Sequence, residues 1–406
     1  MTQALLKVHN TMDAFSSQAW NALLPDTCPF VRYEFLQALE QHQCVSPEFG
    51  WIPRHIGLYK NNDLVAAMPL YEKHNNYGEF VFDQAWSEAW QHAGLNYYPK
   101  LVSAIPYSPV LGPRLLTHPK LDLAHQERLQ TQLIESVQQL CLQNNLSGAH
   151  LLFSNPTQQN WLAKQPNWLS RQDCQFHWLN QGYEHFDDFL ATLTAKKRKN
   201  IKQERQSVKK SGVTFRLLNG ETATKEDWAQ FELFYQKTFI EKWGTPTLNR
   251  AFFEAIATAL PKQVLLVLAD DSNGQCIAGS LMFQSDTHLY GRHWGCISEV
   301  KNLHFEACFY QGIEHAIRQG LQVFEPGAGG EHKIARGFIP IAMQSAHWLS
   351  YNPFPEAINR FIFQEKQAVE SYMQDCIAHA PYKNTDNFYL AKGKPKPIMQ
   401  IEKEHL

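Results

Sequence analysis

Several features that mark other protein classes are missing from this chain of 406 residues. Its longest apolar stretches, such as residues 264 to 269, are far shorter than the ~20 residues needed to span a bilayer. The N-terminus has no basic start followed by a long apolar core, so we expect no secretory signal. The formal net charge is only −2. A general electrostatic attraction to nucleic acid or membranes is therefore excluded, and any such attraction must come from a local patch.

Cysteine and histidine motifs of the kind that bind metals are also missing from the sequence. The eight cysteines are scattered without a Cys-x-x-Cys pair, which favours small core residues in a reduced, cytoplasmic compartment. The histidines between residues 288 and 347 show no His-Glu-x-x-His or similar spacing, so we predict no metal site. Cys308 is predicted to be a core residue of an apolar helix, with an acyl-carrying nucleophile as the less favoured alternative.

The chain has enough apolar sequence for two domains. Hydrophobic residues make up 44% and aromatic residues 13% of it, and its length exceeds one comfortable hydrophobic core. We place the domains at residues 1–174 and 175–406. In the first, apolar residues recur at helical spacing over 123–143. The aromatic block around Trp86, Trp90, Tyr97 and Tyr98 favours core packing over a ligand wall.

Both domains mix helices and strands. In the first domain a further helix is predicted at residues 33–42, and strands at 54–60, 64–72 and 149–154. In the second domain, helices are predicted at residues 186–194, 195–210, 228–243, 248–260, 305–319 and 355–378. Its strands are predicted at residues 213–218, 264–269, 276–284, 288–295, 320–324 and 345–350. The sequence therefore predicts an α/β fold throughout.

A glycine-rich stretch, EPGAGGEHKIAR at residues 325–336, follows one of these strands. It combines three glycines with five ionisable residues, Glu325, Glu331, His332, Lys333 and Arg336. Glycines let backbone amides approach a ligand or adopt positive φ, and charged side chains beside them orient that ligand. The stretch is neither a P-loop nor a dinucleotide fingerprint. We predict a functional site here, with an ordinary exposed turn as the alternative.

The strongest charge run lies at residues 195–210. If this run is helical, residues three and four apart fall on one face, which aligns Arg198, Lys202, Arg205 and Lys209. A cationic stripe of this kind suits phosphate groups. A solvated helix face is the alternative, and it is the usual outcome for a charge run.

Several of these segments resemble the FemAB-like branch of the GNAT superfamily. The resemblance rests on KKRKNIK at 196–202, FYQKTFIEKWGTP at 234–246, IAGSL at 277–281 and FEPGAGGEHK at 324–333. The pieces YYPKL at 97–101, GPRLL at 112–116 and HFEAC at 304–308 are similar to bacterial N-acyltransferases that are associated with peptidoglycan biosynthesis. The resemblance covers nearly the whole chain.

The resemblance implies two tandem GNAT-like domains, with mixed sheets flanked by helices. It also implies an enzyme, an N-acyltransferase that moves an acyl or aminoacyl group to a small-molecule or peptide amine. No tightly bound cofactor is expected. The co-substrate, acyl-CoA or aminoacyl-tRNA, stays open because CISEVKNLH after residue 295 lacks the usual CoA-binding loop motif. The alternatives are a tRNA-dependent transferase acting on a peptidoglycan precursor and a non-catalytic binding module.

Acyl transfer to an amine needs a proton acceptor and hydrogen-bond donors for the oxyanion. The candidate catalytic residues are Glu325, Glu331, His332 and Tyr290, with the tyrosine as a general acid. The candidate substrate-binding residues are Gly327, Gly329, Gly330, Lys333 and Arg336 in the glycine-rich stretch, Arg292, His293 and Trp294 on the preceding strand, and Lys197, Arg198, Lys202 and Arg205 on the basic helix. The sequence does not predict an oligomeric state.

Overall fold

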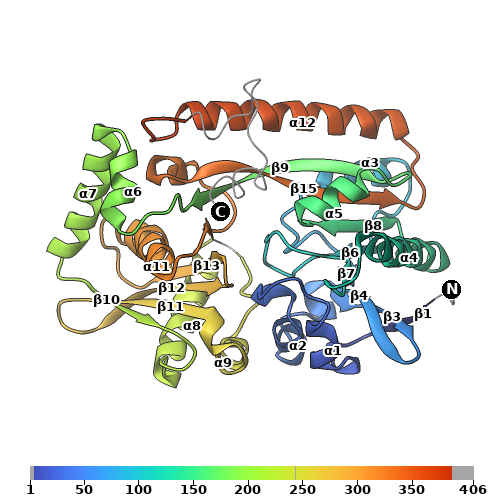
Figure 1. The fold of residues 1–406 in the computed structure, drawn as a ribbon, viewed down its shortest axis with the longest axis horizontal. Helices are drawn as coiled ribbons and strands as arrows, with labels where there is room; N and C mark the ends of the chain where they lie inside the picture. Colours follow the sequence, from blue (N-terminus) through green and yellow to red (C-terminus); the bar gives the residue numbers. More distant parts are fainter. Residues whose placement is uncertain (1–3, 243, 386–406) are drawn as a thin grey trace. The chain divides into compact units, whose positions relative to one another are not determined.

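The computed structural model describes residues 4–242 and 244–385, so Trp243 at the end of one predicted helix lies outside the described residues. Two units can be followed in the ribbon (Figure 1). The first comprises Met1–Asp173 and Met343–Ala368, and the second comprises Cys174–Ala342 and Val369–Leu406. The chain passes between them within strand β9 (Leu169–Leu179), strand β15 (Ile339–Leu349) and helix α12 (Pro355–Ala378). The division into domains 1–174 and 175–406 stays a proposal.

The first unit contains two groups of paired strands. One group is antiparallel throughout, in the order β1 (Leu5–His9), β3 (His55–Lys60), β4 (Asp63–Met68) and β7 (Leu116–Thr117). The other runs from β15 through β8 (Gly148–Leu152), β6 (Lys100–Ser103) and β5 (Tyr71–Lys73) to β2 (Trp51–Pro53). Within it the β6 and β8 strands are parallel, whereas the β15 and β8 strands are antiparallel.

Besides the first part of α12, five α-helices accompany these strands in the described part of the first unit. They are α1 (Ser17–Asn21), α2 (Tyr33–Gln41), α3 (Gln84–His92), α4 (Leu123–Gln143) and α5 (Pro156–Leu162). Helix α4 matches the predicted bounds because its signals are strong: the side chain of Asp122 caps its N-terminus by accepting a hydrogen bond from the His125 amide at 2.8 Å. Leu133, Val137 and Cys141 form the buried stripe that packs into the core.

The aromatic block of the first unit lies in a core. Trp86, Trp90 and Tyr97 are buried together with Ile358, and Tyr98 packs against them. The prediction of core packing is therefore confirmed.

The second unit is built on strands in the order β10 (Thr214–Leu218), β11 (Val264–Asp270), β12 (Cys276–Gln284), β13 (His288–Cys296), β14 (Val323–Glu325) and β9. Neighbouring strands are antiparallel except β13 and β14, which are parallel. A helical crossover joins this parallel pair, as a parallel connection requires. The crossover consists of α10 (Leu303–Phe305), a π-helix (Glu306–Tyr310) and α11 (Gln311–Gln319).

The remaining helices of the second unit are α6 (Phe186–Thr192), α7 (Ala195–Lys210), α8 (Lys225–Glu241) and α9 (Arg250–Ala259). Helices α8 and α11 cover opposite faces of the β11–β13 strands (Figure 1). On the α8 face, Gly279 and Gly295 are cross-strand partners. A Cβ atom on Gly295 would lie 2.0 Å from the carbonyl oxygen of Phe234, so these glycines allow α8 to approach the sheet closely.

Several predicted elements differ from the structure. The predicted strand 64–72 is divided into β4 and β5, which belong to different groups of paired strands. The predicted helix 305–319 begins earlier, at Leu303, and contains the π-helical turn before α11. The predicted strand 320–324 is shorter, because Gly320 ends α11 in the left-handed region and β14 starts at Val323. The predicted strand 345–350 is the end of β15, which starts at Ile339.

Candidate active site

The glycine-rich loop follows strand β14 at the carboxyl end of the parallel β13–β14 pair. The two strands pair only from His288 to Tyr290 and from Val323 to Glu325. The loop glycines at 327, 329 and 330 have φ values of +93°, +67° and +92°. Since side-chain-bearing residues rarely adopt this region, glycine is what the loop backbone requires. A 3-10 helix, η6 (Glu331–Arg336), follows immediately.

Lys333 is the residue around which this loop is folded. Its side chain is buried, and Nζ donates hydrogen bonds to the carbonyl oxygens of Gly327 at 2.6 Å and Ala328 at 3.2 Å. Burial, and secondly the positive charge of Arg292, lower the pKa of Lys333 to about 8. The loop thus surrounds an ammonium group that can lose its proton close to neutral pH.

A buried ion pair lies next to the loop on the parallel strands. Arg292 Nη2 is 3.6 Å from Glu325 Oε2, and the two side chains are 3% and 2% exposed. Arg292 Nη1 also donates to the carbonyl oxygen of Gly291 at 2.6 Å and to that of Glu325 at 3.4 Å. Tyr290 is buried and is the register partner of Glu325. Three of the predicted residues are therefore brought together where the pairing of β13 with β14 ends.

His332 and Glu331 lie on the exposed side of η6. The His332 ring is within 6 Å of the rings of His304 and Phe309, at 5.9 and 5.6 Å between centroids. Partial burial, followed by the charges of Lys333 and Arg336, lowers the pKa of His332, so its imidazole is neutral at pH 7. Glu331 Oε1 accepts a hydrogen bond from the hydroxyl of Tyr372 at 3.1 Å.

Arg336 anchors the far end of η6 to helix α7. Its Nη1 donates to the carbonyl oxygen of His332 at 2.7 Å, and its Nη2 donates to Glu204 Oε1 at 2.7 Å. The guanidinium lies 3.3 Å from the ring centroid of Phe305. Tyr310 of the π-helix donates a hydrogen bond to the other oxygen of Glu204. Arg336 therefore holds the loop in place from a buried position.

The predicted cationic stripe on α7 is divided in the structure. Arg205 turns inward, where its Nη2 donates to Glu306 at 3.0 Å and to Glu314 at 2.7 Å. Lys202 stays exposed and pairs with Asp187 at 3.2 Å. Of the other two members of the stripe, Arg198 is half-exposed and Lys209 is exposed, and the substrate-binding candidate Lys197 is half-exposed. The cations of this helix with exposed side chains are Lys196, Lys199, Lys202, Lys209 and Lys210.

The strand residues 292–294 do not share one environment. His293 faces α8, where its ring lies 5.0 Å from that of Tyr235, and burial lowers its pKa to about 3. Trp294 faces the crossover, with its ring 5.4 Å from that of His304. Arg292 and Trp294 thus lie towards the glycine-rich loop and its neighbours, whereas His293 packs on the opposite face. Burial raises the pKa of Cys308 to about 12, so this thiol stays protonated at pH 7.

The sequence carries no signal for three residues that the fold brings to predicted site residues. His177 on β9 is buried, and neither ring nitrogen has a hydrogen-bond partner among residues 4–242 and 244–385. Burial, with the charges of His288, Arg292 and Lys333, holds its pKa well below 6.5. Glu204 was hidden by the basic run around it, and Glu306 by an apolar helix. A single histidine or carboxylate within a regular element gives no signal of its own. Only the fold brings His177 near Lys333, Glu204 to Arg336, and Glu306 to Arg205.

The described part of the chain has no group of three or more His, Cys, Asp or Glu side chains that could hold a metal ion. Of the helices in residues 4–242 and 244–385, none is long and apolar enough to cross a bilayer.

The chain was compared with protein families and solved structures. Residues 11–384 match the FemAB-like family, described as peptidoglycan biosynthesis/recognition. Among solved structures, FemX is 11% identical, with 88% of this chain and 99% of FemX covered at a TM-score of 0.50. A tandem GNAT protein from the clavulanic acid biosynthesis pathway is 8% identical, covering 87% and 100% at a TM-score of 0.44. L-PGS from Bacillus licheniformis is 11% identical, covering 83% and 98% at 0.46. A search of curated proteins gave no significant match.

Proposed function

The chain belongs to the FemAB-like family, and on this premise we propose that it is an N-acyltransferase of peptidoglycan synthesis. Its fold is that of tandem GNAT-like α/β proteins. The observation that carries the proposal is the buried ammonium of Lys333, held by two loop carbonyls beside the Arg292–Glu325 pair. A preorganised, buried cation suits a reaction that develops negative charge on an oxygen.

In the proposed reaction, the lone pair of an acceptor amine attacks the carbonyl carbon of an acyl donor. The carbonyl oxygen becomes an oxyanion, which needs hydrogen-bond donors at about 2.7–3.1 Å. An ammonium has three N–H groups, and two of those on Lys333 are used by Gly327 and Ala328. We assign the third, together with the amides of Gly329 and Gly330, to the oxyanion. The tetrahedral intermediate then collapses by breaking the bond to the thiolate of CoA or the 3′ oxygen of tRNA.

The attacking amine must also lose a proton. His332 is our candidate for the base, because its imidazole is neutral at pH 7 and reaches the exposed side of η6. Glu325 is buried against Arg292, so we assign it the role of holding that arginine. Tyr290, opposite Glu325, is the candidate acid that returns a proton to the leaving group. Glu331, which accepts a hydrogen bond from Tyr372, is kept as the alternative base.

The donor can be identified by thermal unfolding of the purified protein with a panel of acyl-CoAs, free CoA and bulk aminoacyl-tRNA. A ligand at 100 times its Kd adds about 2.7 kcal/mol to the free energy of unfolding, which moves Tm by a few degrees. A shift with one acyl-CoA identifies the donor class, and a shift only with aminoacyl-tRNA selects the alternative below. No shift with any of them favours a non-catalytic binding module.

Transfer to a panel of amines and peptidoglycan precursors then tests the roles of the residues. Lys333→Met is expected to lower kcat about 10²- to 10³-fold, which is typical for the loss of one oxyanion donor. His332→Gln is expected to lower kcat by a similar factor and to remove the acidic limb of the pH–rate profile. Lys301→Met is the matched control, because this lysine is exposed. Unchanged transfer in the Lys333 and His332 variants would contradict the site assignment.

A tRNA-dependent transferase is the second candidate, and the exposed lysines of α7 favour it. A helix with five exposed cations matches the phosphate backbone of RNA. Replacing Lys196, Lys199 and Lys210 with glutamine is expected to weaken RNA binding and to reduce its dependence on salt concentration. Arg205 is left intact, because its contacts with Glu306 and Glu314 are structural. RNA affinity that is unaffected by the triple replacement would exclude this candidate.

A further inference from the structure

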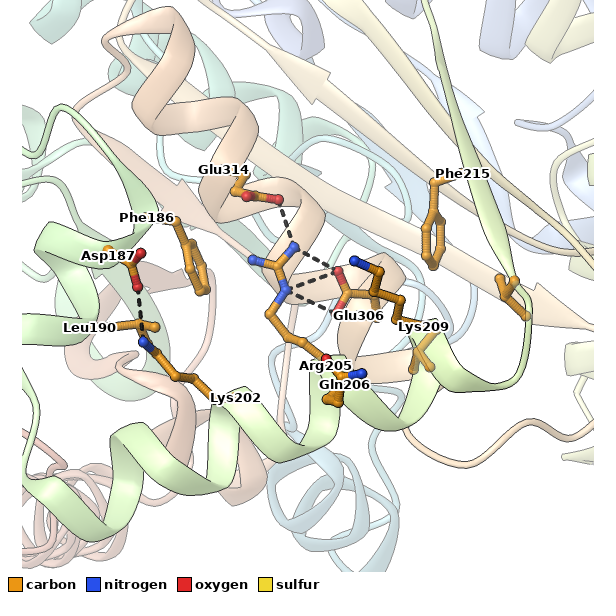
Figure 2. A pocket seen from close by; sticks show the side chains of 12 residues that line it. Phe186, Asp187, Leu190, Lys202, Arg205, Gln206, Lys209, Phe215, Glu306 and Glu314 are labelled. Atoms are coloured by element: carbon orange, nitrogen blue, oxygen red, sulfur yellow. Dashed lines mark hydrogen bonds and ion pairs between the residues drawn. The ribbon is translucent and has the colours of Figure 1, made fainter.

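A cavity of about 500 Å³ lies in the second unit, away from the glycine-rich loop. It is lined by parts of α6, α7, β10, the π-helix and α11 (Figure 2). None of the residues 325–337 lines it. Its volume lies within the range of small-molecule pockets. A π-helical turn inside a longer helix costs stability and is frequently found at functional sites.

The centre of this cavity is a charged cluster with unused hydrogen-bonding capacity. Arg205 Nε and Nη2 donate hydrogen bonds to Glu306 and Glu314, at distances from 2.7 to 3.2 Å. Both oxygens of Glu306 are thereby occupied, and Gln311 adds a further bond at 2.8 Å. In the described part of the chain, Arg205 Nη1 donates no hydrogen bond, and only one oxygen of Glu314 accepts one. The cation Arg205 therefore keeps one donor atom available for a ligand, and the carboxylate of Glu314 keeps one acceptor oxygen available.

Two lysines of α7 complete the charges of the lining. Lys202 is three residues before Arg205 and pairs with Asp187, whereas Lys209 is four residues after it. Residues at these spacings share a helix face. Within residues 4–242 and 244–385, Lys209 has no carboxylate within ion-pair distance. The cavity lining thus carries three cations and three carboxylates. Its net charge is zero, but Lys209 does not form an ion pair with any of these carboxylates.

Apolar side chains form two walls around these charges. Phe186 and Leu190 come from α6, and Phe215 comes from β10. The guanidinium of Arg205 lies over the ring of Phe186, 4.5 Å from its centroid, so the aromatic face stabilises the cation. A ligand that enters this space therefore meets charge at its centre and hydrocarbon on either side.

From this arrangement we propose that the cavity binds a small amphipathic zwitterion of the apolar α-amino-acid type. The ammonium of the ligand contacts the free oxygen of Glu314, and its carboxylate contacts Arg205 Nη1 and Lys209. The apolar side chain lies against Phe186 or Phe215. A ligand with a single charge leaves one of the open polar groups desolvated without a partner, which is costly, whereas a zwitterion satisfies both. The site does not depend on the proposed transferase activity.

Isothermal titration of the full-length protein with three related probes tests this site. L-phenylalanine carries both charges, 3-phenylpropionate lacks the ammonium, and 2-phenylethylamine lacks the carboxylate. We expect saturable binding of L-phenylalanine, and of L-leucine as a second zwitterion, with each singly charged analogue at least ten-fold weaker. Failure of both amino acids to bind, or equal affinity for a singly charged analogue, would overturn the proposal.

Two variants locate the binding. Glu314→Gln and Lys209→Met are each expected to weaken L-phenylalanine binding at least ten-fold, because each removes one charge that the ligand contacts. Lys210→Met is the matched control, since this neighbouring exposed lysine does not line the cavity. Far-ultraviolet circular dichroism and Tm establish that each variant is folded. Undiminished binding in both folded variants would show that the ligand binds elsewhere and would overturn the proposal.

Discussion

Replacing Lys333 with methionine is expected to change how the free energy of unfolding depends on pH. The wild-type ammonium is buried, and its pKa is lowered from 10.5 to about 8. In the unfolded chain the same side chain has its ordinary pKa. Below pH 8 both states bind the proton, and above about pH 10.5 neither does. Between these limits the unfolded state binds more protons, so stability rises with pH.

The size of this effect follows from the two pKa values. The slope approaches 1.4 kcal/mol per pH unit where the two states differ by a whole proton. Integrated from pH 8 to pH 10, Lys333 contributes a rise of about 2 kcal/mol. Methionine cannot titrate, so the variant loses this rise. At pH 7 the variant also loses the hydrogen bonds to Gly327 and Ala328 but no longer buries a charge, and these two effects oppose each other.

Urea unfolding followed by tryptophan fluorescence, at half-unit steps from pH 7.5 to 10, measures the difference between the two curves. Groups common to both proteins cancel in that difference. Lys301→Met is the control, and its curve is expected to parallel the wild type because Lys301 is exposed. If the Lys333→Met curve also runs parallel to the wild type, the ammonium is not held in the environment described above, and its proposed role fails with it.

Three further changes test other parts of the second unit. Gly295→Ala is expected to cost about 1–3 kcal/mol in the free energy of unfolding, because its Cβ would meet the carbonyl oxygen of Phe234. Glu204→Gln is expected to increase amide hydrogen exchange in residues 331–336, since it removes the charge that holds Arg336, with a loss of about 1.5–3 kcal/mol. His177→Leu is expected to reduce the loss of stability below pH 6.5 by about 1.4 kcal/mol per pH unit, because the wild-type histidine has a lowered pKa and must unfold to bind a proton.

Two substitutions of exposed residues serve as controls for the Glu204 and His177 variants. Gln203→Ala alters an exposed neighbour of Glu204 and is expected to leave exchange in residues 331–336 unchanged. His379→Gln removes an exposed histidine and is expected to leave the acid limb of the stability curve as in the wild type. Wild-type stability of Gly295→Ala, or an unaltered acid limb in His177→Leu, would contradict the packing described for those residues.

Regular elements were predictable wherever local signals were strong. Helix α4 carries an Asp cap and an apolar stripe, and α7 spans the whole basic run, so both match their predicted bounds. The π-helical turn and the early start of β15 were not predictable. Both depend on how distant segments pack, and no local periodicity encodes them.

The candidate site was likewise predictable only in part from the sequence. The glycine-rich stretch was found from the sequence because positive φ and clustered charges are properties of adjacent residues. Its partners could not be found in this way. His177 and Glu204 lie within regular elements more than 100 residues before the loop in the chain, and Glu306, the partner of Arg205, lies 19 residues before Glu325.

By itself, the sequence determined the α/β class, the family resemblance, the basic helix and the position of the glycine-rich loop, because each of these depends on short-range patterns. Only the tertiary structure decided which charges meet. It turned Arg205 of the predicted phosphate stripe onto Glu306 and Glu314, and it buried Lys333 while leaving its neighbour His332 exposed. The physical reason is that burial and ion pairing depend on which side of an element faces the core, and that is fixed by contacts between segments far apart in the chain.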